Sequence, residues 1–226
     1  MKGSIKAIAK PLIIASFLSV FSFSSYAEPN NLSLLKKEIQ TYHDSGLYEK
    51  ELAHVINQAE NYIIQQAKIN ARHGHTKKLA IVLDIDETSL SNYNKMAKRE
   101  FIGDKTLIHQ EILAANSPAI EPMLKLYNDA IKNGVQVFFV TGRVMSELNA
   151  TRKNLLNAGF KNWAGLYMRP DSYNQPSIAP FKTQARASIT SQGYTIVASI
   201  GDQYSDIEGG YMQKGFKLPN PFYHLP

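Results

Sequence analysis

Residues 79–88 read Leu-Ala-Ile-Val-Leu-Asp-Ile-Asp-Glu-Thr, and this stretch decides the fold of the chain. Its first five residues are all apolar, as in a strand that is buried on both faces of a parallel sheet. Asp84 and Asp86 then follow at the carboxyl end of the strand, and strand alternation points them the same way with Ile85 toward the core. Open α/β sheets bind ligands at this edge. The ten residues alone fit a solvated acidic loop equally well, so the rest of the chain decides between the two readings.

The first 27 residues have the pattern of a signal peptide. Three lysines precede an apolar stretch, Pro11–Phe23, and Ser25-Tyr26-Ala27 supplies small residues two positions apart, as a cleavage site needs. The apolar stretch is shorter than the roughly 20 residues that a membrane-spanning helix requires. We therefore expect cleavage after Ala27 and a periplasmic or secreted protein with no membrane attachment once the signal peptide is removed.

The remaining residues, 28–226, suit one domain with a full core. The leader holds three of the 25 basic residues and none of the 19 acidic ones, so half of the net charge of +6 belongs to the leader. The basic balance therefore gives little support for a nucleic-acid partner, and none is predicted. The chain has no cysteine, so an exported form relies on its core or on a bound metal rather than on disulfides.

Helix and strand patterns alternate after residue 79, which favours βαβ units around a parallel sheet. Expected helices cover 32–42, 47–71, 118–133, 145–158 and 182–191, and expected strands cover 79–83, 135–140, 163–168 and 195–200. The predicted fold class is α/β: a Rossmann-like three-layer sandwich with a mostly parallel central sheet and an extra helical N-terminal region, about 31–73. A polar, irregular insertion at about 89–117 is placed to form a small cap, and the proline-rich Leu218–Pro221 is expected to wrap the surface.

Further polar residues follow the other predicted strands. Thr141-Gly142-Arg143 ends the second strand and supplies a hydroxyl, an amide that permits close approach and a cation. Gly201-Asp202 ends the fourth strand, with Asp206 four residues later, and Lys182 opens the helix before it. Because parallel strands end at one edge of a sheet, we expect these groups to share a cleft with Asp84 and Asp86.

This set of groups suits a phosphoryl group bound with a metal ion. Four clustered carboxylates raise one another's pKa unless a cation lies among them. Oxygen ligands with no His or Cys at ligand spacing favour Mg²⁺. A lysine then offsets the negative charge of the phosphoryl oxygens, and a hydroxyl and glycine amides hold them in position.

These motifs resemble those of the haloacid dehalogenase (HAD) superfamily. Asp84-Ile85-Asp86-Glu87-Thr88 resembles the first motif, Asp-x-Asp-x-Thr, and Thr141, Lys182 and Gly201-Asp202-x-x-x-Asp206 resemble the second, third and fourth. The likeness is closer to the exported class B/C-like acid phosphatases of bacteria and the plant vegetative storage proteins. It runs from about Lys78 to the end of the chain.

The resemblance implies a role for each matched residue. Asp84 is the implied nucleophile and a metal ligand, and Asp86 is the implied general acid and base, with its backbone carbonyl on the metal. Thr141 and Lys182 are implied to hold the phosphoryl group, beside Gly142. Asp202 and Asp206 complete the implied Mg²⁺ site. The implied activity is that of a phosphoric monoester hydrolase, and a protonated Asp86 among like charges predicts an acidic optimum.

Other residues fit two different roles. Arg143 either touches phosphate or forms a salt bridge at the head of the next helix. His73 and His75 fit a metal pair, although a solvated linker is favoured because no third ligand is evident. Glu87 is expected to face solvent or to brace its loop.

The expected substrate is a small phosphorylated molecule, either a nucleotide or an aryl or alkyl phosphomonoester. Tyr93 and Phe101 in the insertion fit stacking on a nucleoside or aryl group, but ordinary packing of the cap is favoured. Two alternative functions remain: phosphotransfer to an alcohol, and phosphate binding without turnover, as in storage-type relatives. Homo-oligomerisation stays open, because no exposed heptad or repeated apolar stripe indicates it.

Overall fold

The computed structural model describes residues 29–225, so the predicted signal peptide lies outside the described residues. Within that range, no helix combines the length and the apolar character needed to cross a membrane. From Leu32 onward the chain forms one compact unit.

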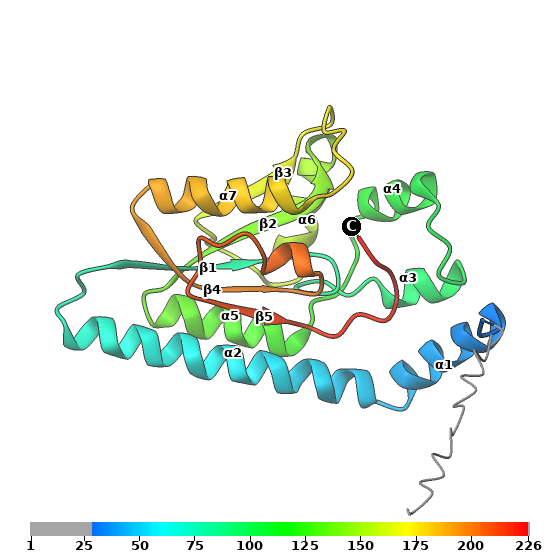
Figure 1. The fold of residues 1–226 in the computed structure, drawn as a ribbon, viewed down its shortest axis with the longest axis horizontal. Helices are drawn as coiled ribbons and strands as arrows, with labels where there is room; N and C mark the ends of the chain where they lie inside the picture. The colour runs from blue at the N-terminus through cyan, green and yellow to red at the C-terminus, as the bar shows by residue number, and fades with distance from the viewer. Residues whose placement is uncertain (1–28, 226) are drawn as a thin grey trace, which may run out of the picture. The chain divides into compact units, whose positions relative to one another are not determined.

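A five-stranded sheet forms the centre of this unit (Figure 1). The strands are β1 (Lys78–Leu83), β2 (Gln136–Val144), β3 (Gly165–Arg169), β4 (Tyr194–Gly201) and β5 (Lys214–Lys217). Their order is β3-β2-β1-β4-β5, and every neighbouring pair is parallel. The predicted α/β class with a parallel sheet is confirmed. The edge strand β5 was not expected, because its four residues, Lys-Gly-Phe-Lys, carry only one apolar side chain.

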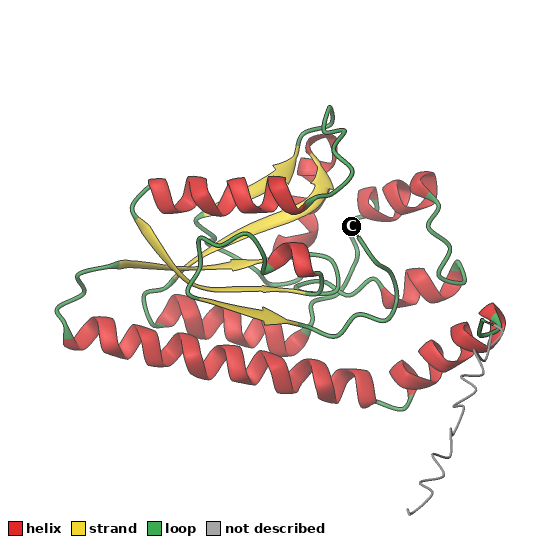
Figure 2. Ribbon diagram, viewed as in Figure 1, coloured by secondary structure: helices red, strands yellow, loops and turns green. Residues whose placement is uncertain are grey.

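Helices lie on both faces of the sheet (Figure 2). The α-helices are α1 (Leu32–Asp44), α2 (Leu47–Arg72), α3 (Tyr93–Lys98), α4 (Lys105–Leu113), α5 (Glu121–Lys132), α6 (Leu148–Asn157) and α7 (Ala179–Ser191), and two 3-10 turns are η1 (Met145–Glu147) and η2 (Tyr204–Asp206). α2 and α5 lie on one side and α7 on the other (Figure 1). Strand β1 serves both layers, because Ile81 and Leu83 pack in one core cluster and Ala80 and Val82 in the other.

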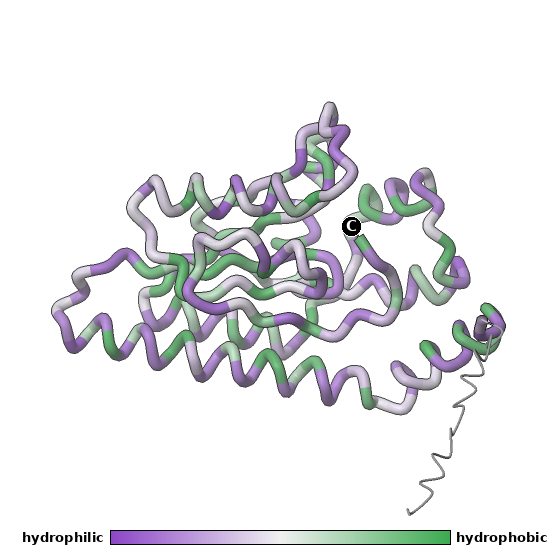
Figure 3. The backbone as a smooth tube through the Cα atoms, in the orientation of Figure 1, coloured by the Kyte–Doolittle hydropathy of each residue, from purple (hydrophilic) through white to green (hydrophobic). Residues whose placement is uncertain are grey.

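The helical N-terminal region is part of this core. α2 buries one stripe of side chains against the sheet and α5, and its backbone alternates between hydrophilic and hydrophobic segments in Figure 3. The buried residues are Tyr48, Leu52, Ile56, Ala59, Ile63 and Ala67. Each fully buried aliphatic side chain of this kind contributes about 1.5–3 kcal/mol. The predicted stripe is therefore core packing, as expected from its helical spacing.

The insertion at 89–117 is not irregular, as its polar composition suggested. It contains α3 and α4, and Asp104 caps α4 by accepting hydrogen bonds from the amides of Thr106 and Leu107 at 2.8 and 3.0 Å. Neither helix is long, and α4 buries no residue fully. Short helices without an apolar stripe give no periodic signal, which explains why the pattern missed them.

The chain after β5 has no strand, but it does more than wrap the surface. Leu218 is fully buried, and Phe222 packs edge-on against Tyr48 of α2 with ring centroids 5.0 Å apart. This segment also carries Asn220 to the acidic end of β4, where its amide donates to Asp202.

Candidate active site

Three carboxylates and one ammonium group meet at the carboxyl ends of β1 and β4. Asp84 follows β1, Asp202 follows β4 and Asp206 lies in η2, and each offers an oxygen within 4.8 Å of the others. Lys182 lies in the first turn of α7. Its Nζ donates a hydrogen bond to Asp84 Oδ1 at 2.8 Å and another to Asp206 Oδ1. All four side chains are buried. The predicted convergence of these groups at one sheet edge is what the structure contains.

The charges of this group are unbalanced without a further cation. Burial raises the pKa of Asp84 well above its ordinary value, and Asp206 and Asp202 raise it further against the lowering effect of Lys182. Burial by itself would lower the pKa of Lys182, but Asp206 and Asp84 together raise it above its ordinary value. Three ionised carboxylates and one ammonium leave a charge of about −2 in a buried site. A divalent cation with oxygen ligands therefore fits these residues.

The absence of a side chain at Gly201 makes room for the Asp206 carboxylate. A Cβ atom on Gly201 would lie 2.2 Å from the Asp206 carboxyl carbon, so only glycine fits there. The backbone amide of Gln203 donates to Asp206 Oδ2 at 2.9 Å and fixes the carboxylate in the turn. Asp202 in turn accepts hydrogen bonds from Thr88 at 3.2 Å and from the Gln203 amide at 2.7 Å.

Asp86 lies beside this group in a different environment. Arg143 holds it in a two-pronged ion pair, with Nη2 2.7 Å from Oδ1 and Nε 3.0 Å from Oδ2, and Asn92 Nδ2 donates to Oδ1 at 2.8 Å. Burial by itself would raise the pKa of Asp86, but the charge and hydrogen bonds of Arg143, with Asn92, lower it. The expectation that like charges favour a protonated Asp86 therefore does not hold here. Its side chain is also 26% exposed, so substrate can reach it.

Thr141 and Gly142 lie where β2 passes the site. Thr141 is fully buried, and its hydroxyl accepts a hydrogen bond from the Arg143 amide at 3.1 Å. Gly142 is half-buried, and a Cβ there would meet its nearest neighbour at 3.9 Å, so space alone does not require glycine. Phosphate binding by these two residues stays a prediction.

The sequence left Arg143 between two readings and did not single out Asn92, Asn220 or Gln203. Arg143 pairs with Asp86 and also donates to Thr151 of α6 at 3.3 Å, so the ion-pair reading describes this structure, with Asp86 as the partner. The other three are amides that orient the carboxylates of Asp86 and Asp202. Asn220 lies 18 positions from Asp202, and an amide near an acidic motif, as at Asn92 and Gln203, is too common to serve as a signal by itself.

Glu87 does not face solvent. It is 2% exposed, has a backbone φ of 53°, and accepts hydrogen bonds from the backbone and side-chain amides of Asn92. Burial, followed by the charge of Asp86, raises the pKa of Glu87 to about 8. It therefore braces the loop, which is the other of its two readings.

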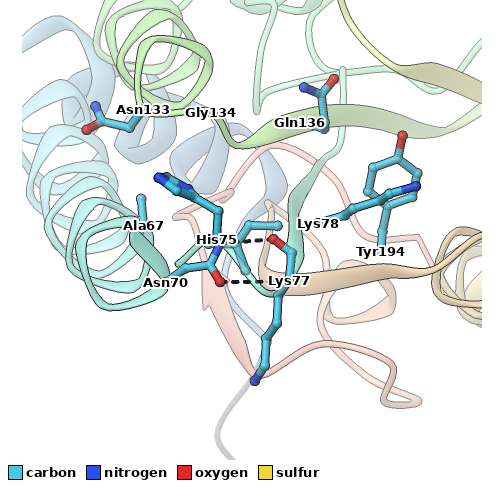
Figure 4. Close-up of a pocket in the computed structure, with 10 residues that line it drawn as sticks. Ala67, Asn70, His75, Lys77, Lys78, Asn133, Gly134, Gln136 and Tyr194 are labelled. Atoms are coloured by element: carbon cyan, nitrogen blue, oxygen red, sulfur yellow. Dashed lines mark hydrogen bonds between the residues drawn. The ribbon is translucent and has the colours of Figure 1, made fainter. Parts of the chain in front are cut away.

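The histidine pair lies at the opposite edge of the sheet. His75 lines a cavity of about 340 Å³ with Lys78, Gln136 and Tyr194, which are the first residues of β1, β2 and β4 (Figure 4). Among the described residues, the one group placed to hold a metal is that of Asp84, Asp202 and Asp206, and it includes no histidine. Both histidines are exposed, and His73 Nδ1 lies 2.8 Å from the Ile69 carbonyl oxygen, which agrees with the solvated-linker reading.

Tyr93 and Phe101 pack with other rings rather than lining an open site. Their ring centroids lie 5.4 and 6.1 Å from that of Phe222, and Tyr93 is 7% exposed. His43 at the end of α1 stacks on Tyr93 as well. The cap, the N-terminal helices and the C-terminal segment thus share one aromatic cluster, as the packing interpretation of the cap predicts.

An open parallel α/β sheet that brings an Asp-x-Asp pair, a threonine, a lysine and a Gly-Asp-x-x-x-Asp loop to one edge defines a protein of the haloacid dehalogenase class. The family model described as HAD superfamily, subfamily IIIB (acid phosphatase), matches residues 10–226. The chain belongs to this family. The resemblance seen in the sequence motifs is confirmed.

Individual relatives agree with this assignment. The chain is 37% identical to the stem 28 kDa glycoprotein of Glycine max over 71% of this chain and 66% of that protein. It is 31% identical to acid phosphatase 1 of Solanum lycopersicum over 88% of this chain and 80% of that protein. The solved structure of the class C acid phosphatase from Bacillus anthracis matches with a TM-score of 0.66 over 84% of this chain and 86% of that chain, and at 22% identity it supports the fold.

Proposed function

We propose that this protein is an exported, Mg²⁺-dependent phosphatase that hydrolyses phosphate monoesters through an aspartyl-phosphate on Asp84. The single observation that carries the proposal is the contact of Lys182 Nζ with Asp84 Oδ1, 2.8 Å, inside a buried group of three carboxylates. That arrangement gives a nucleophilic carboxylate a cation at its side and a second cation-binding position among the acids. Family membership supports the same reaction class.

The reaction divides into two displacements at phosphorus. A carboxylate oxygen of Asp84 bonds to phosphorus while the bond to the leaving oxygen breaks, and Asp86 gives that oxygen a proton. Asp86 then takes a proton from water, whose oxygen bonds to phosphorus as the bond to Asp84 breaks and inorganic phosphate leaves. One carboxyl group serves both halves because it returns to its starting protonation state.

The surrounding residues are proposed to bind the phosphoryl group and the metal ion during these steps. Lys182, Thr141 and the Gly142 amide are proposed to hold the phosphoryl oxygens. Asp84, Asp202, Asp206 and the backbone carbonyl of Asp86 are the proposed Mg²⁺ ligands, and the ion, when bound, offsets negative charge on the phosphoryl group. Because burial raises the pKa of Asp84, its ionised form depends on Lys182 and on such a cation.

The ion pair of Asp86 bears on the pH optimum. Arg143 lowers the pKa of Asp86, so the protonated form that the leaving group needs becomes abundant only at low pH. An acidic optimum follows for substrates whose leaving group must be protonated. Export to the periplasm or out of the cell rests on the leader pattern in residues 1–27.

Two other functions share this site. Transfer of the phosphoryl group to an alcohol would use the same intermediate, with the alcohol in place of water. Phosphate binding without turnover, as proposed for storage-type relatives, would need no intact nucleophile, whereas Asp84, Asp86 and Lys182 are all present. The substrate class remains small phosphomonoesters, nucleotide or aryl and alkyl.

Hydrolysis of an aryl phosphate by the protein, at about pH 5 to 7, tests the proposal with Mg²⁺, with chelator and with Asp84→Asn. We expect turnover that requires the metal and that the substitution abolishes, whereas Asp171→Asn, at an exposed aspartate after β3, keeps it. Folded protein without turnover in any divalent metal would favour the binding function. Added glycerol that lowers released phosphate relative to released phenol would indicate transfer.

A further inference from the structure

We propose that Asn92, which precedes the first helix of the cap, is a positioning residue that sets which oxygen of Asp86 faces the leaving group. The inference rests on the proposed function, since it concerns the proton donor of that reaction. It starts from one contact: Asn92 Nδ2 donates to Asp86 Oδ1 at 2.8 Å. The residue pair joins the cap insertion directly to the carboxyl group beside the three buried acids.

The two carboxylate oxygens of Asp86 accept different numbers of hydrogen bonds. Oδ1 accepts from Arg143 Nη2 at 2.7 Å and from Asn92 Nδ2 at 2.8 Å, and Arg143 Nε also lies 3.2 Å from it. Within residues 29–225, Oδ2 accepts only from Arg143 Nε, at 3.0 Å. A carboxylate oxygen has about two acceptor positions. Asn92 therefore fills Oδ1 and leaves Oδ2 as the oxygen that can carry a proton to the leaving group.

The direction of the Asn92 amide is fixed by a chain of donors. Lys95 Nζ has only hydrogens to give, and it donates to Ser117 Oγ at 2.8 Å. Ser117 Oγ then donates its own hydrogen to Asn92 Oδ1 at 2.7 Å. With its oxygen thus engaged, the Asn92 amide must turn its NH₂ group toward Asp86. The ammonium group of Lys95 thereby sets the polarity of the whole chain.

Ser117 is itself anchored to the core. Its backbone amide donates to Asn154 Oδ1 at 3.0 Å, and Asn154 Nδ2 donates back to its carbonyl at 2.6 Å. Asn92 lies near the start of the insertion and Ser117 at its end. The two ends of the cap therefore meet beside Asp86 and are tied to α6, so the cap contributes to proton transfer.

A bracing role for Asn92 is the competing explanation, because it also contacts Glu87. Its backbone amide donates to Glu87 Oε1, and its Nδ2 lies 3.2 Å from Glu87 Oε2. Loss of a brace lowers activity toward all substrates alike. Loss of proton-donor alignment lowers it chiefly for poor leaving groups, because a nitrophenolate departs without a proton and an alkoxide does not.

The experiment measures kcat/KM for 4-nitrophenyl, phenyl and ethyl phosphate with wild type, Asn92→Ala, Ser117→Ala and the control Asn94→Ala, which removes an exposed amide two residues away. For Asn92→Ala we expect about a 10²-fold loss on ethyl phosphate and less than about a threefold loss on 4-nitrophenyl phosphate. Ser117→Ala keeps Asn92 but frees its amide, so we expect a smaller loss in the same order of substrates. Asn94→Ala matches wild type.

Equal losses across the three substrates, or no loss, would overturn the inference. If Asn92→Ala does not fold, the order of losses in Ser117→Ala decides the question, since Lys95 keeps its bond to the Glu111 carbonyl in that variant. A wild-type protein without turnover would instead count against the proposed function. The two failures are thereby distinguishable.

Discussion

Asp84 and Asp86 share one strand end but differ in what surrounds them. Burial and the neighbouring carboxylates raise the pKa of Asp84, whereas Arg143 outweighs burial and lowers that of Asp86. In the proposed mechanism, Asp84 therefore depends on a cation to stay ionised as the nucleophile, and Asp86 is kept ready to accept a proton from water. Two carboxylates with opposite shifts are the arrangement that separates nucleophile from acid and base.

The Arg143→Gln substitution tests the role of this ion pair. Without the guanidinium charge the pKa of Asp86 rises, so the carboxyl group stays protonated to higher pH. We expect the falling limb of kcat/KM for an alkyl phosphate to move to higher pH. The lost pair also costs about 2 kcal/mol of stability, less than a fully buried pair because Asp86 is partly exposed. pH–rate profiles and thermal melts measure the two effects.

Arg152→Gln, at an exposed arginine of α6, is the matched control and leaves both the profile and the stability as in wild type. A limb that stays in place in Arg143→Gln would mean that Asp86 is not the group whose titration limits the reaction.

At the scale of elements, the carboxyl end of β4 leaves no space for a side chain at Gly201. The Gly201→Ala substitution would put a Cβ atom 2.2 Å from the Asp206 carboxyl carbon, and that short buried side chain cannot yield without leaving Lys182. We expect turnover to fall at least about 10²-fold and the affinity for Mg²⁺ to fall with it. Isothermal titration and steady-state rates measure these losses.

Gly103→Ala is the control, because a Cβ there meets nothing within 4 Å. Wild-type metal affinity in Gly201→Ala would show that Asp206 is not needed for the ion.

The cap is docked to the core by a second polar contact. His109 of α4 lies 2.7 Å through Nδ1 from Oε1 of the buried Glu147, whose other oxygen accepts from the Val144 amide. His109→Ala removes this tie, which at a partly exposed histidine is worth about 0.2–1 kcal/mol. We expect faster amide hydrogen exchange in α4, with the exchange of β1 unchanged. His54→Ala, on the exposed face of α2, serves as control, and unaltered exchange in α4 would refute the docking role.

Sequence patterns predicted the elements whose signal is local. The apolar run at 79–83 and the stripe of α2 follow from periodicity, and the acidic strand ends follow from parallel topology. The pairing of Arg143 with Asp86 spans 57 positions, and no local pattern encodes such a partner. Asn92 was missed for the same reason, since its function depends on Ser117 at the far end of the insertion.

At the scale of the whole molecule, the N-terminal helices belong to the same core as the catalytic sheet. Ile56 of α2 is fully buried in the cluster that also holds Leu83, the residue before Asp84. Ile56→Ala removes apolar contacts and leaves a cavity, for which we expect a loss of about 2–4 kcal/mol. Denaturant titration measures the loss. Ile69→Ala, at an exposed position of the same helix, should change stability by less than about 0.5 kcal/mol, and equal losses would contradict a core role for α2.

The buried carboxyl groups should also make the stability of the fold depend on pH and on bound metal. Burial raises the pKa of Glu87 from 4.5 to about 8, and it raises those of Asp84 and Asp202 as well. The folded protein then holds protons that the unfolded chain releases, so metal-free stability falls as pH rises from about 4.5 to about 8. The lowered pKa of Asp86 acts in the opposite direction, but only below its ordinary value of 3.8, outside this range.

At the proposed site, Mg²⁺ bound among Asp84, Asp202 and Asp206 would replace those protons, so its binding would strengthen as pH rises. We therefore expect added Mg²⁺ to raise the melting temperature more at about pH 8 than at about pH 5, as thermal melts with and without chelator would measure. Asp202→Asn removes one of the three carboxylates and should abolish the metal-dependent rise while lessening the decline of metal-free stability with pH. An equal rise at both pH values would mean that the ion binds elsewhere, because only a site that holds protons in the metal-free protein links metal affinity to pH in this direction.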